Sequence, residues 1–271
     1  MTMSSTDTAD TATSTSSAGT PIRVAVVGAR GRMGSEACRA VEDAPDLELV
    51  ARVDRDDDIA VITEAGAQVM VDFSVPAATK DNVLWAIRNG VHAVVGATGW
   101  DQASLDEVRE ALSGDGRDGV GVLIAPNFAI GAVLTMRFAE IAARYYDSAE
   151  IIEMHHPDKL DAPSGTANHT AAAVARGRAA GGLGPVPDAT EKDPLGARGA
   201  VVDGIHVHAV RQRGLVAHEV VQFGGAGEQF QLRHDSFDRA SFMTGVLLGI
   251  RRVAEHPGLT HGLDGYMDLG L

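Results

Sequence analysis

The stretch IRVAVVGARGRMG, residues 22–34, predicts the fold class of this 271-residue chain. Its valine-rich start, residues 22–28, is typical of a buried strand, and Gly28, Gly31 and Gly34 mark the turn that follows. Glycines between a strand and a helix allow a tight bend and let the backbone approach a pyrophosphate, which the positive end of the helix attracts. The spacing GxxGxxG differs by one residue from the usual GxGxxG. Because the triplet lies between a strand and a helix, it predicts a dinucleotide-binding turn.

The first half of the chain alternates between strand-like and helix-like segments. Further apolar runs that predict strands lie at residues 47–54, 67–74, 92–100 and 119–128. Helical patterns lie at residues 33–44, 76–90, 104–112 and 132–146. Such alternation is typical of parallel βαβ units with helices on both faces of the sheet. We therefore expect an α/β fold with a Rossmann-type doubly wound parallel sheet.

The second half follows a different pattern. Residues 150–156 predict a strand that runs into a loop, and the alanine-rich residues 164–177 predict a helix. After a long Gly- and Pro-rich loop over 178–204, three strand-like segments with turns between them suggest antiparallel pairing: 205–213, 217–225 and 228–235. We expect an α+β domain with a mixed or antiparallel sheet. The closing helical segment, 238–256, is apolar enough to pack back onto the first domain.

These patterns divide the chain into a tail and two domains. Residues 1–20 are small and polar, which predicts a disordered N-terminal tail. Residues 21–129 and 241–271 form the expected dinucleotide-binding domain. Residues 130–240 form the expected substrate-binding domain.

Charge and composition exclude several classes of function. A formal net charge of -14 and an aromatic content of 4% disfavour binding to nucleic acid or anionic lipid. No apolar run of about 18 residues occurs, so we expect no membrane span. Cys38 is the only cysteine, which removes an intramolecular disulfide and a cysteine-based zinc site. A cytoplasmic protein that binds a small anionic metabolite fits these properties, because a local cluster of cations can outweigh distant negative charge.

Asp54 ends the second predicted strand, 20 residues beyond Gly34. An acidic side chain at this place in a dinucleotide-binding unit accepts hydrogen bonds from ribose hydroxyls. Arg55 could pair with a 2′-phosphate, so the two residues suggest tolerance of both NADH and NADPH. The alternative is that both merely begin the acidic turn DRDDD. The turns GATG (96–99) and APNF (125–128) end the fourth and fifth strands and should border the nicotinamide, because ligands bind outside the carboxyl ends of parallel strands.

The segment EMHHPDKLDAPSGTANHT, residues 153–170, concentrates groups that move protons or hold anions. His155 and His156 end a strand, so their side chains point to opposite sides. Histidine titrates near neutral pH and can donate a proton there. Lys159 offers an ammonium group for a carboxylate. Ser164-Gly165-Thr166 opens a helix and predicts an N-cap followed by backbone N–H groups suited to a second carboxylate.

These groups together fit the reduction of a conjugated C=N or C=C bond in a dianionic substrate, which needs a hydride on one atom and a proton on its neighbour. Other chemistries lack the residues they need. Cys38 lies inside the first predicted helix and offers no accessible nucleophile, and the GxSxG turn of serine hydrolases is missing. No metal is expected, because the candidate histidines match no zinc spacing: His155, His156, His206, His208, His218 and His234.

The motifs VAVVGARGRMG, GATGW, APNFAIGA and EMHHPDKLDAPSGTA together resemble the dihydrodipicolinate reductase family, also called 4-hydroxy-tetrahydrodipicolinate reductase. The resemblance runs from residue 22 to the C-terminus and implies reduction of 4-hydroxy-tetrahydrodipicolinate to tetrahydrodipicolinate with loss of water, in the diaminopimelate route to lysine. It implies NADH or NADPH as the cofactor. It also implies a homotetramer built through the sheet of the second domain, which would therefore serve in oligomerisation as well.

The resemblance also implies roles for single residues. His155 would be the proton donor and acceptor and Lys159 a second proton donor. His156, Gly165 and Thr166 would bind substrate together with Ser164. The cofactor would contact Gly28, Ala29, Arg30, Gly31, Arg32, Met33, Asp54, Arg55, Gly96, Ala97, Thr98, Ala125, Pro126, Asn127 and Phe128, and Phe223 is expected near the nicotinamide. The GTTG turn of the family is GATG here, so Ala97 can contribute only its backbone.

Two other functions stay open. The first is a reductase of similar architecture that acts on amino acids or sugars, and a panel of substrates would distinguish it from a reductase of dicarboxylates. A non-catalytic nicotinamide sensor would bind NADH without turnover.

Overall fold

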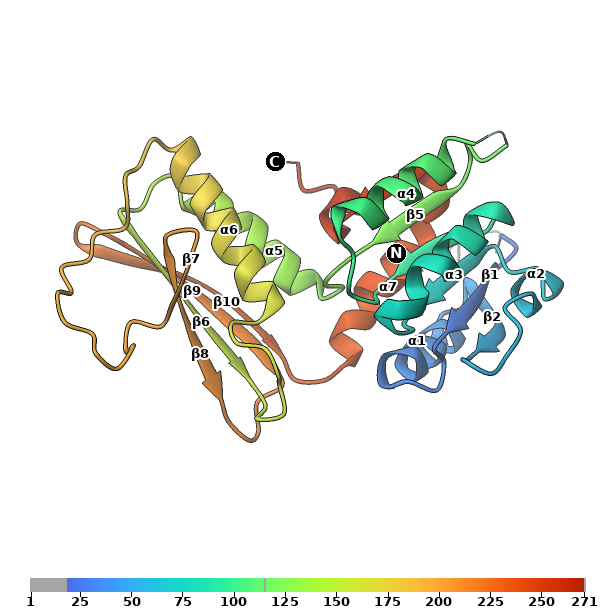
Figure 1. Cartoon of the computed structure of the whole chain (residues 1–271), viewed down its shortest axis with the longest axis horizontal. Coiled ribbons are helices and arrows are strands. Elements are labelled where there is room, and N and C mark those ends of the chain that lie inside the picture. Colours follow the sequence, from blue (N-terminus) through green and yellow to red (C-terminus); the bar gives the residue numbers. More distant parts are fainter. Residues whose placement is uncertain (1–18, 115, 271) are drawn as a thin grey trace, which may run out of the picture.

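The computed structural model describes residues 19–114 and 116–270, which form two lobes, each built on one sheet (Figure 1). Residues 1–18 of the tail predicted over residues 1–20 lie outside the described residues. In the described part of the chain, no helix is both long and apolar enough to cross a bilayer.

The first domain contains a six-stranded parallel sheet with the order β11-β5-β4-β3-β1-β2. All five predicted strands form, and the apolar residues of β3, β4 and β5 and most of those of β1 are buried because helices cover both faces, whereas the edge strand β2 is buried only at Leu47 and Val53. The strand β11 was not predicted from the sequence, and it comes from the C-terminal segment to extend the sheet beside β5. The strands are β1 (Ile22–Val27), β2 (Leu47–Val53), β3 (Val69–Asp72), β4 (His92–Val95), β5 (Gly121–Ile124) and β11 (Gly258–His261).

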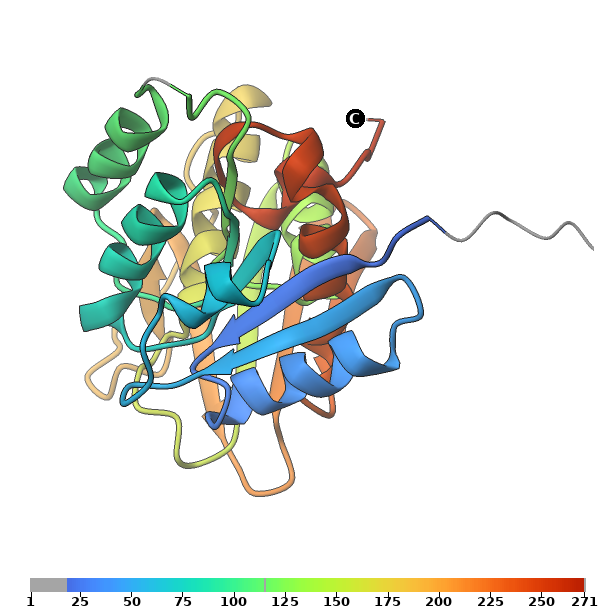
Figure 2. The ribbon, with the colours of Figure 1, turned by 90° about the vertical axis from the view of Figure 1, so that its right-hand side faces the viewer.

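Helices cover both faces of this sheet (Figure 2). One face carries α1 (Arg32–Asp43) and α7 (Ala240–Arg252), whose buried side chains share a core with β1 and β3. The closing helix thus packs on the first domain, as its apolar pattern predicted. The other face carries α2 (Val61–Glu64), α3 (Pro76–Arg88) and α4 (Gln102–Leu112). Short 3₁₀ turns, η1 (Val253–Glu255) and η2 (Leu263–Tyr266), follow α7 and flank β11.

The second domain contains a five-stranded mixed sheet with the order β10-β9-β6-β8-β7. Helices α5 (Ile130–Ala142) and α6 (Gly165–Ala180) pack against one face of it. The helix α6 ends three residues later than predicted, and the short strand β7 falls inside the predicted loop. The strands are β6 (Ser148–His155), β7 (Ala200–Val202), β8 (Ile205–Arg211), β9 (Ala217–Gly225) and β10 (Glu228–Ser236).

The expected pairing of this sheet was only partly right. Strands β9 and β10 form the predicted antiparallel hairpin. Strand β8, however, does not pair with β9, because β6 lies between them and pairs parallel to β8 and antiparallel to β9. The helix α6 lies in the connection from β6 to β8, which is how parallel neighbours are usually joined. The fold class is confirmed, with a Rossmann-type sheet followed by a mixed α+β sheet, whereas the domain boundaries stay a prediction.

Candidate active site

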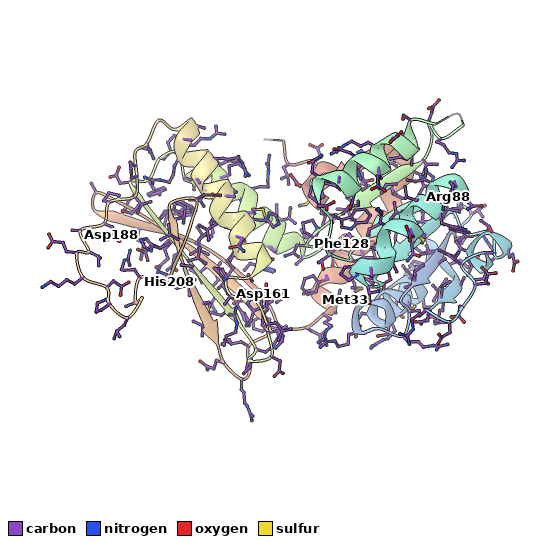
Figure 3. The ribbon with its side chains drawn as sticks, in the orientation of Figure 1. Met33, Arg88, Phe128, Asp161, Asp188 and His208 are labelled. Carbon is purple, nitrogen blue, oxygen red and sulfur yellow. The ribbon has the colours of Figure 1, made fainter. Side chains whose placement is uncertain are left out.

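A cavity of about 470 Å³ lies between the two domains, at the carboxyl ends of β4 and β5. The first domain supplies the turns after these strands and His261 at the end of β11, and the second domain supplies the end of β6 and the start of α6. In Figure 3, Phe128 of the first domain and Asp161 of the second domain are labelled on the sides of the two lobes that face each other. The lining residues are Ala97, Thr98, Gly99, Trp100, Ile124, Pro126, Asn127, Met136, His155, Lys159, Asp161, Ser164, Gly165, Thr166, His169, Ala217, Phe242 and His261.

The wall from the first domain is formed by the GATG turn. Gly99 has a φ of 98°, a conformation that favours glycine. Gly96 has no room for a side chain, because a Cβ atom there would lie 2.1 Å from the ring of Phe73. The indole of Trp100 donates a hydrogen bond to the carbonyl of Ala97 at 3.1 Å and closes the turn. The backbone of the turn therefore has a fixed course along the cavity.

The wall from the second domain carries the groups that can move a proton. Strand β6 ends at His155, whose Nδ1 lies 2.6 Å from a carboxylate oxygen of Glu153. Lys159 donates a hydrogen bond to Asp161, and this bond holds the pKa of Asp161 below its usual range. Ser164 caps α6 by accepting a hydrogen bond from the Ala167 N–H at 3.2 Å. An imidazole, an ammonium and a helix start thus face the GATG turn.

A second cavity, of about 550 Å³, lies beside the glycine turn and is lined by Gly28, Gly31 and Asp54 among others. Gly28 has a φ of 74°, and a Cβ atom there would lie 2.6 Å from the carbonyl oxygen of Phe73. A Cβ atom on Gly34 would lie 2.0 Å from the carbonyl oxygen of Gly28. Both glycines are therefore required by close backbone approach. The carboxylate of Asp54 accepts a hydrogen bond from the Arg30 N–H at 2.9 Å, so it stands over the turn.

The structure brings some of the expected cofactor residues to these cavities and not others. Arg30 and Arg55 line the second cavity, and Arg55 has a nearly fully exposed side chain. Arg32 is exposed at the start of α1. Several others lie behind the surface and shape the turns by packing: Ala29, Met33, Ala125 and Phe128 are in or against the core that α1 and α7 share with the sheet. His156 is half-buried and is not among the residues that line either cavity.

The expected position of Phe223 was wrong. Phe223 is 1% exposed and lies in the core of the second domain, where its ring packs against Tyr146 at 5.7 Å and Phe230 at 6.1 Å between centroids. It sits near the end of β9 away from the cavity, because its partner across β6 is Ala149, at the opposite end of that strand from His155. The sequence alone did not give the distance of Phe223 from the site.

Other lining residues were missed by the sequence reasoning. Phe242 lies in the first turn of α7 and reaches the cavity between the domains, together with Met136 of α5. His169 of α6 and His261 of β11 add two imidazoles to the same cavity. The apolar pattern of the closing helix was a signal for packing on the first domain, but nothing in it distinguished Phe242 from its neighbours.

Fold and site define the class of this protein. The first domain is of the Rossmann type and carries a glycine turn with its own cavity. Its GATG turn shares a second cavity with proton-bearing groups of the mixed-sheet domain, and this arrangement is that of a two-domain oxidoreductase. The model of the N-terminal part of dihydrodipicolinate reductase matches residues 22–128, and the model of its C-terminal part matches residues 131–267. The chain belongs to the dihydrodipicolinate reductase family.

Individual relatives agree with this assignment. The chain is 56% identical over 248 residues to the 4-hydroxy-tetrahydrodipicolinate reductase of Corynebacterium efficiens, covering 92% of this chain and 99% of the relative. A dipicolinate-bound dihydrodipicolinate reductase from Paenisporosarcina sp. TG-14 superposes with a TM-score of 0.82 at 38% identity, over 91% of this chain and 100% of the other. GenD2 from gentamicin A biosynthesis, solved in complex with NAD, shares the fold at 17% identity and a TM-score of 0.58, over 93% of this chain and 91% of the other.

Proposed function

We propose that this chain reduces 4-hydroxy-tetrahydrodipicolinate to tetrahydrodipicolinate, with loss of water, in the diaminopimelate route to lysine. One observation carries the proposal: His155, Lys159 and the start of α6 face the GATG turn across a single cavity of about 470 Å³. Membership of the family supports the reaction, and the dipicolinate-bound relative supports a small cyclic dicarboxylate as the ligand class.

NADH or NADPH is the proposed cofactor, and the residues of the first domain fit it. The close packing at Gly28 and Gly34 leaves a cradle without side chains, and the free N–H groups at the start of α1 can bind the pyrophosphate. Asp54 and Arg55 line the cavity beside the glycine turn; Asp54 would accept hydrogen bonds from the ribose, and Arg55 would pair with a 2′-phosphate. When bound, the nicotinamide supplies the hydride. Thr98 and Asn127 line the cavity where its ring would lie.

The second domain would bind and protonate the substrate. Lys159 binds one carboxylate of the substrate. In the structure its ammonium group donates a hydrogen bond to Asp161, and the substrate carboxylate would join or replace Asp161 as its acceptor. The second carboxylate binds the N–H groups of Gly165 and Thr166 at the start of α6, where the helix dipole favours an anion. The imidazole of His155 then donates the proton to the atom next to the one that receives the hydride. His156 is the remaining proposed substrate contact.

Two wider properties belong to the same proposal. We propose a cytoplasmic enzyme, in keeping with one cysteine, Cys38, which is buried. We also propose a homotetramer assembled through the sheet of the second domain. The helices α5 and α6 cover one face of that sheet (Figure 1). On the other face, Asp188 and Arg198 of the loop before β7 pair with His206 and Glu150, and the rest of that face is proposed for subunit contacts.

The test is turnover coupled to the preceding synthase, measured with NADH and NADPH in turn. We expect oxidation of the cofactor that depends on the synthase product and is unaffected by amino acids or sugars. His155→Gln should lower kcat by about 10²-fold or more, as loss of a general acid does, and leave the Kd for NADH unchanged. Turnover of a sugar or an amino acid in preference to the synthase product would contradict the proposed substrate.

A further inference from the structure

The imidazole of His155 is hydrogen-bonded to a fully buried carboxylate. Its Nδ1 lies 2.6 Å from Oε2 of Glu153, two residues earlier on the same face of β6. The imidazole lines the cavity while this hydrogen bond engages the ring nitrogen closer to the backbone. The nitrogen left for a ligand is therefore Nε2. Which nitrogen of a histidine carries the proton is determined by the hydrogen bond that the other nitrogen makes.

Glu153 accepts hydrogen bonds from three further groups. Arg211 of β8 donates from Nη1 to Oε2 at 2.9 Å and from Nη2 to Oε1 at 2.7 Å, and the Ser164 N–H donates to Oε1 at 3.2 Å. Burial raises the pKa of the Glu153 carboxyl. The hydrogen bonds and charges of His155 and Arg211 lower this pKa by a larger amount, so it falls below its usual range. A carboxylate in this state only accepts hydrogen bonds. The proton in the bond to His155 must then come from Nδ1.

Arg211 also fixes the surroundings of this pair. Its Nη2 donates a second hydrogen bond, to the carbonyl oxygen of Asp161 at 2.7 Å. Glu153 itself reaches the start of α6 through Ser164. One buried carboxylate and one guanidinium thus connect the proposed proton donor to the loop of Lys159 and to the helix that would bind the second carboxylate.

We propose that Glu153, held by Arg211, is a positioning residue that keeps a proton on Nδ1 of His155, so that Nε2 is the nitrogen that takes up a proton from solvent and then donates it to the substrate, which returns the ring to the neutral form protonated on Nδ1. The proposal rests on the proposed function for the identity of the substrate, but not for the tautomer. Glu153 does not touch the substrate. It acts by holding the ring in one orientation and one tautomer, as a carboxylate does for the histidine of a catalytic triad.

The same strand supplies a matched control on its other face. Glu150 accepts hydrogen bonds from Arg198 at 2.5 Å and from Nε2 of His208 at 2.7 Å. This set has the same three residue types, yet it does not line the cavity between the domains. His208 and Asp188, which pairs with Arg198, lie in the part of the second lobe away from the first domain (Figure 3). The side chains of Glu150 and Arg198 are 30% and 31% exposed, so substitution of Glu150 tests the loss of a partly exposed ion pair on β6 without disturbing His155.

The first experiment is ¹⁵N NMR of the histidine side chains in the unmodified enzyme, with His155 assigned by its absence in His155→Gln. We expect the neutral ring to carry its proton on Nδ1, with Nε2 unprotonated. A proton on Nε2, or an equal mixture of tautomers, would overturn the proposal. This measurement needs neither substrate nor turnover, so its result is independent of whether the proposed reaction is right.

The second experiment compares Glu153→Gln with Glu150→Gln. The glutamine amide has one acceptor oxygen and an NH₂ group, so it cannot accept all four hydrogen bonds that reach Oε1 and Oε2 of Glu153, and the NH₂ group must face donors at one of the two positions. We expect Glu153→Gln to lower kcat by about 10² -fold, comparable to the loss of general acid catalysis, with a mixed tautomer in the NMR spectrum. Its Kd for NADH should not change, and Glu150→Gln should keep the wild-type kcat.

The outcomes separate the two proposals. A wild-type kcat in Glu153→Gln would overturn the role of Glu153, whatever the substrate. An equal loss of kcat in both variants would also overturn it, because the effect would then be structural. If Glu153→Gln fails to fold, as judged by circular dichroism, the tautomer in the unmodified enzyme decides. Failure of the wild type to reduce the synthase product would contradict the proposed function and leave the tautomer result standing.

Discussion

Asn127 and Thr166 are joined by a hydrogen bond from Nδ2 to Oγ1 of 3.0 Å, and this bond links the two walls of the cavity. Asn127 follows β5 in the first domain, and Thr166 lies in the first turn of α6 in the second. The side-chain oxygen of Asn127 accepts the Ala129 N–H at 2.8 Å, which fixes which end of the amide faces Thr166. The proposed nicotinamide wall is thus tied to the proposed carboxylate site.

This bond leads to the first prediction. Thr166→Val removes the hydroxyl and keeps the shape, and it should lower kcat/KM about fivefold to tenfold, because such a hydrogen bond contributes about 1 kcal/mol. Asn127→Ala should have a similar effect. The double variant should lose little more than either single one, since both remove the same bond. Steady-state kinetics of the four proteins give the coupling, and fully additive losses would show that the bond does not act in the reaction.

The second prediction concerns Lys159. Lys159→Met keeps most of the side-chain volume and removes the charge, so we expect kcat/KM for the substrate to fall by about 10²-fold or more. The affinity for NADH, followed by fluorescence, should be unchanged, because the lysine lies on the wall opposite the GATG turn. Lys192→Met, at an exposed lysine outside the cavity, is the control and should behave as wild type. Equal loss of NADH binding in Lys159→Met would argue against a role in substrate binding.

The third prediction concerns Asp54. Replacing it with alanine removes the acceptor for the Arg30 N–H and the proposed ribose contact, so KM for NADH should rise by about tenfold while kcat at saturation is retained. An exposed aspartate on α1, Asp43, provides the control Asp43→Ala, which should leave KM unchanged. A comparison of NADH with NADPH in the same variants shows which cofactor depends on Asp54. No change in KM for either would remove Asp54 from the site.

The fourth prediction is a dependence of stability on pH that comes from Glu219. Burial, with a smaller contribution from the charge of Glu153, raises the pKa of Glu219 to about 7, although Thr170 donates a hydrogen bond to it at 2.8 Å. A carboxyl with a raised pKa in the folded state stabilises the fold below its unfolded pKa, and this stability is lost as the pH rises through about 7. The loss amounts to about 3 kcal/mol when the pKa rises from 4.5 to about 7.

Glu219→Gln removes the titrating group and keeps the acceptor for Thr170. The pKa of about 7 lies between roughly pH 5 and roughly pH 8.5. Over this range the melting temperature of the wild type should fall more than that of Glu219→Gln. Thermal unfolding at several pH values measures the difference. Parallel curves for the two proteins would mean that Glu219 does not titrate in this range.

Local patterns in the sequence were sufficient for the first domain. Strands such as residues 22–27 are valine-rich because both faces of a parallel sheet are buried, and Gly34 is required by a close contact with the carbonyl of Gly28, six residues earlier in the same turn. The cluster of His155, Lys159 and Thr166 was visible because these residues are close in the chain. Each of these features depends on short-range geometry, which a sequence displays directly.

Features that depend on distant parts of the chain were not accessible in this way. The strand β11, Gly258–His261, has a single large apolar residue, Leu259, and so shows no strand pattern; only pairing with the edge of β5 makes it a strand. The insertion of β6 between β8 and β9 depends on strand order, which alternating burial does not specify. Phe242 and Phe223 are both aromatic residues in apolar segments, and only the tertiary arrangement places one at the cavity and the other in the core.

The return of the chain to the first domain has a consequence for biosynthesis. On the ribosome, residues 148–236, which hold all strands of the middle sheet, emerge before α7 and β11 exist. At that stage the edge of β5 in the first domain has no partner strand, and the sheet face beside α1 is not yet covered by α7. The second domain already contains every strand of its sheet. Translation must pass residue 261 before the sheet of the first domain can close, so a chain terminated before that point would carry a complete second sheet and an incomplete first one.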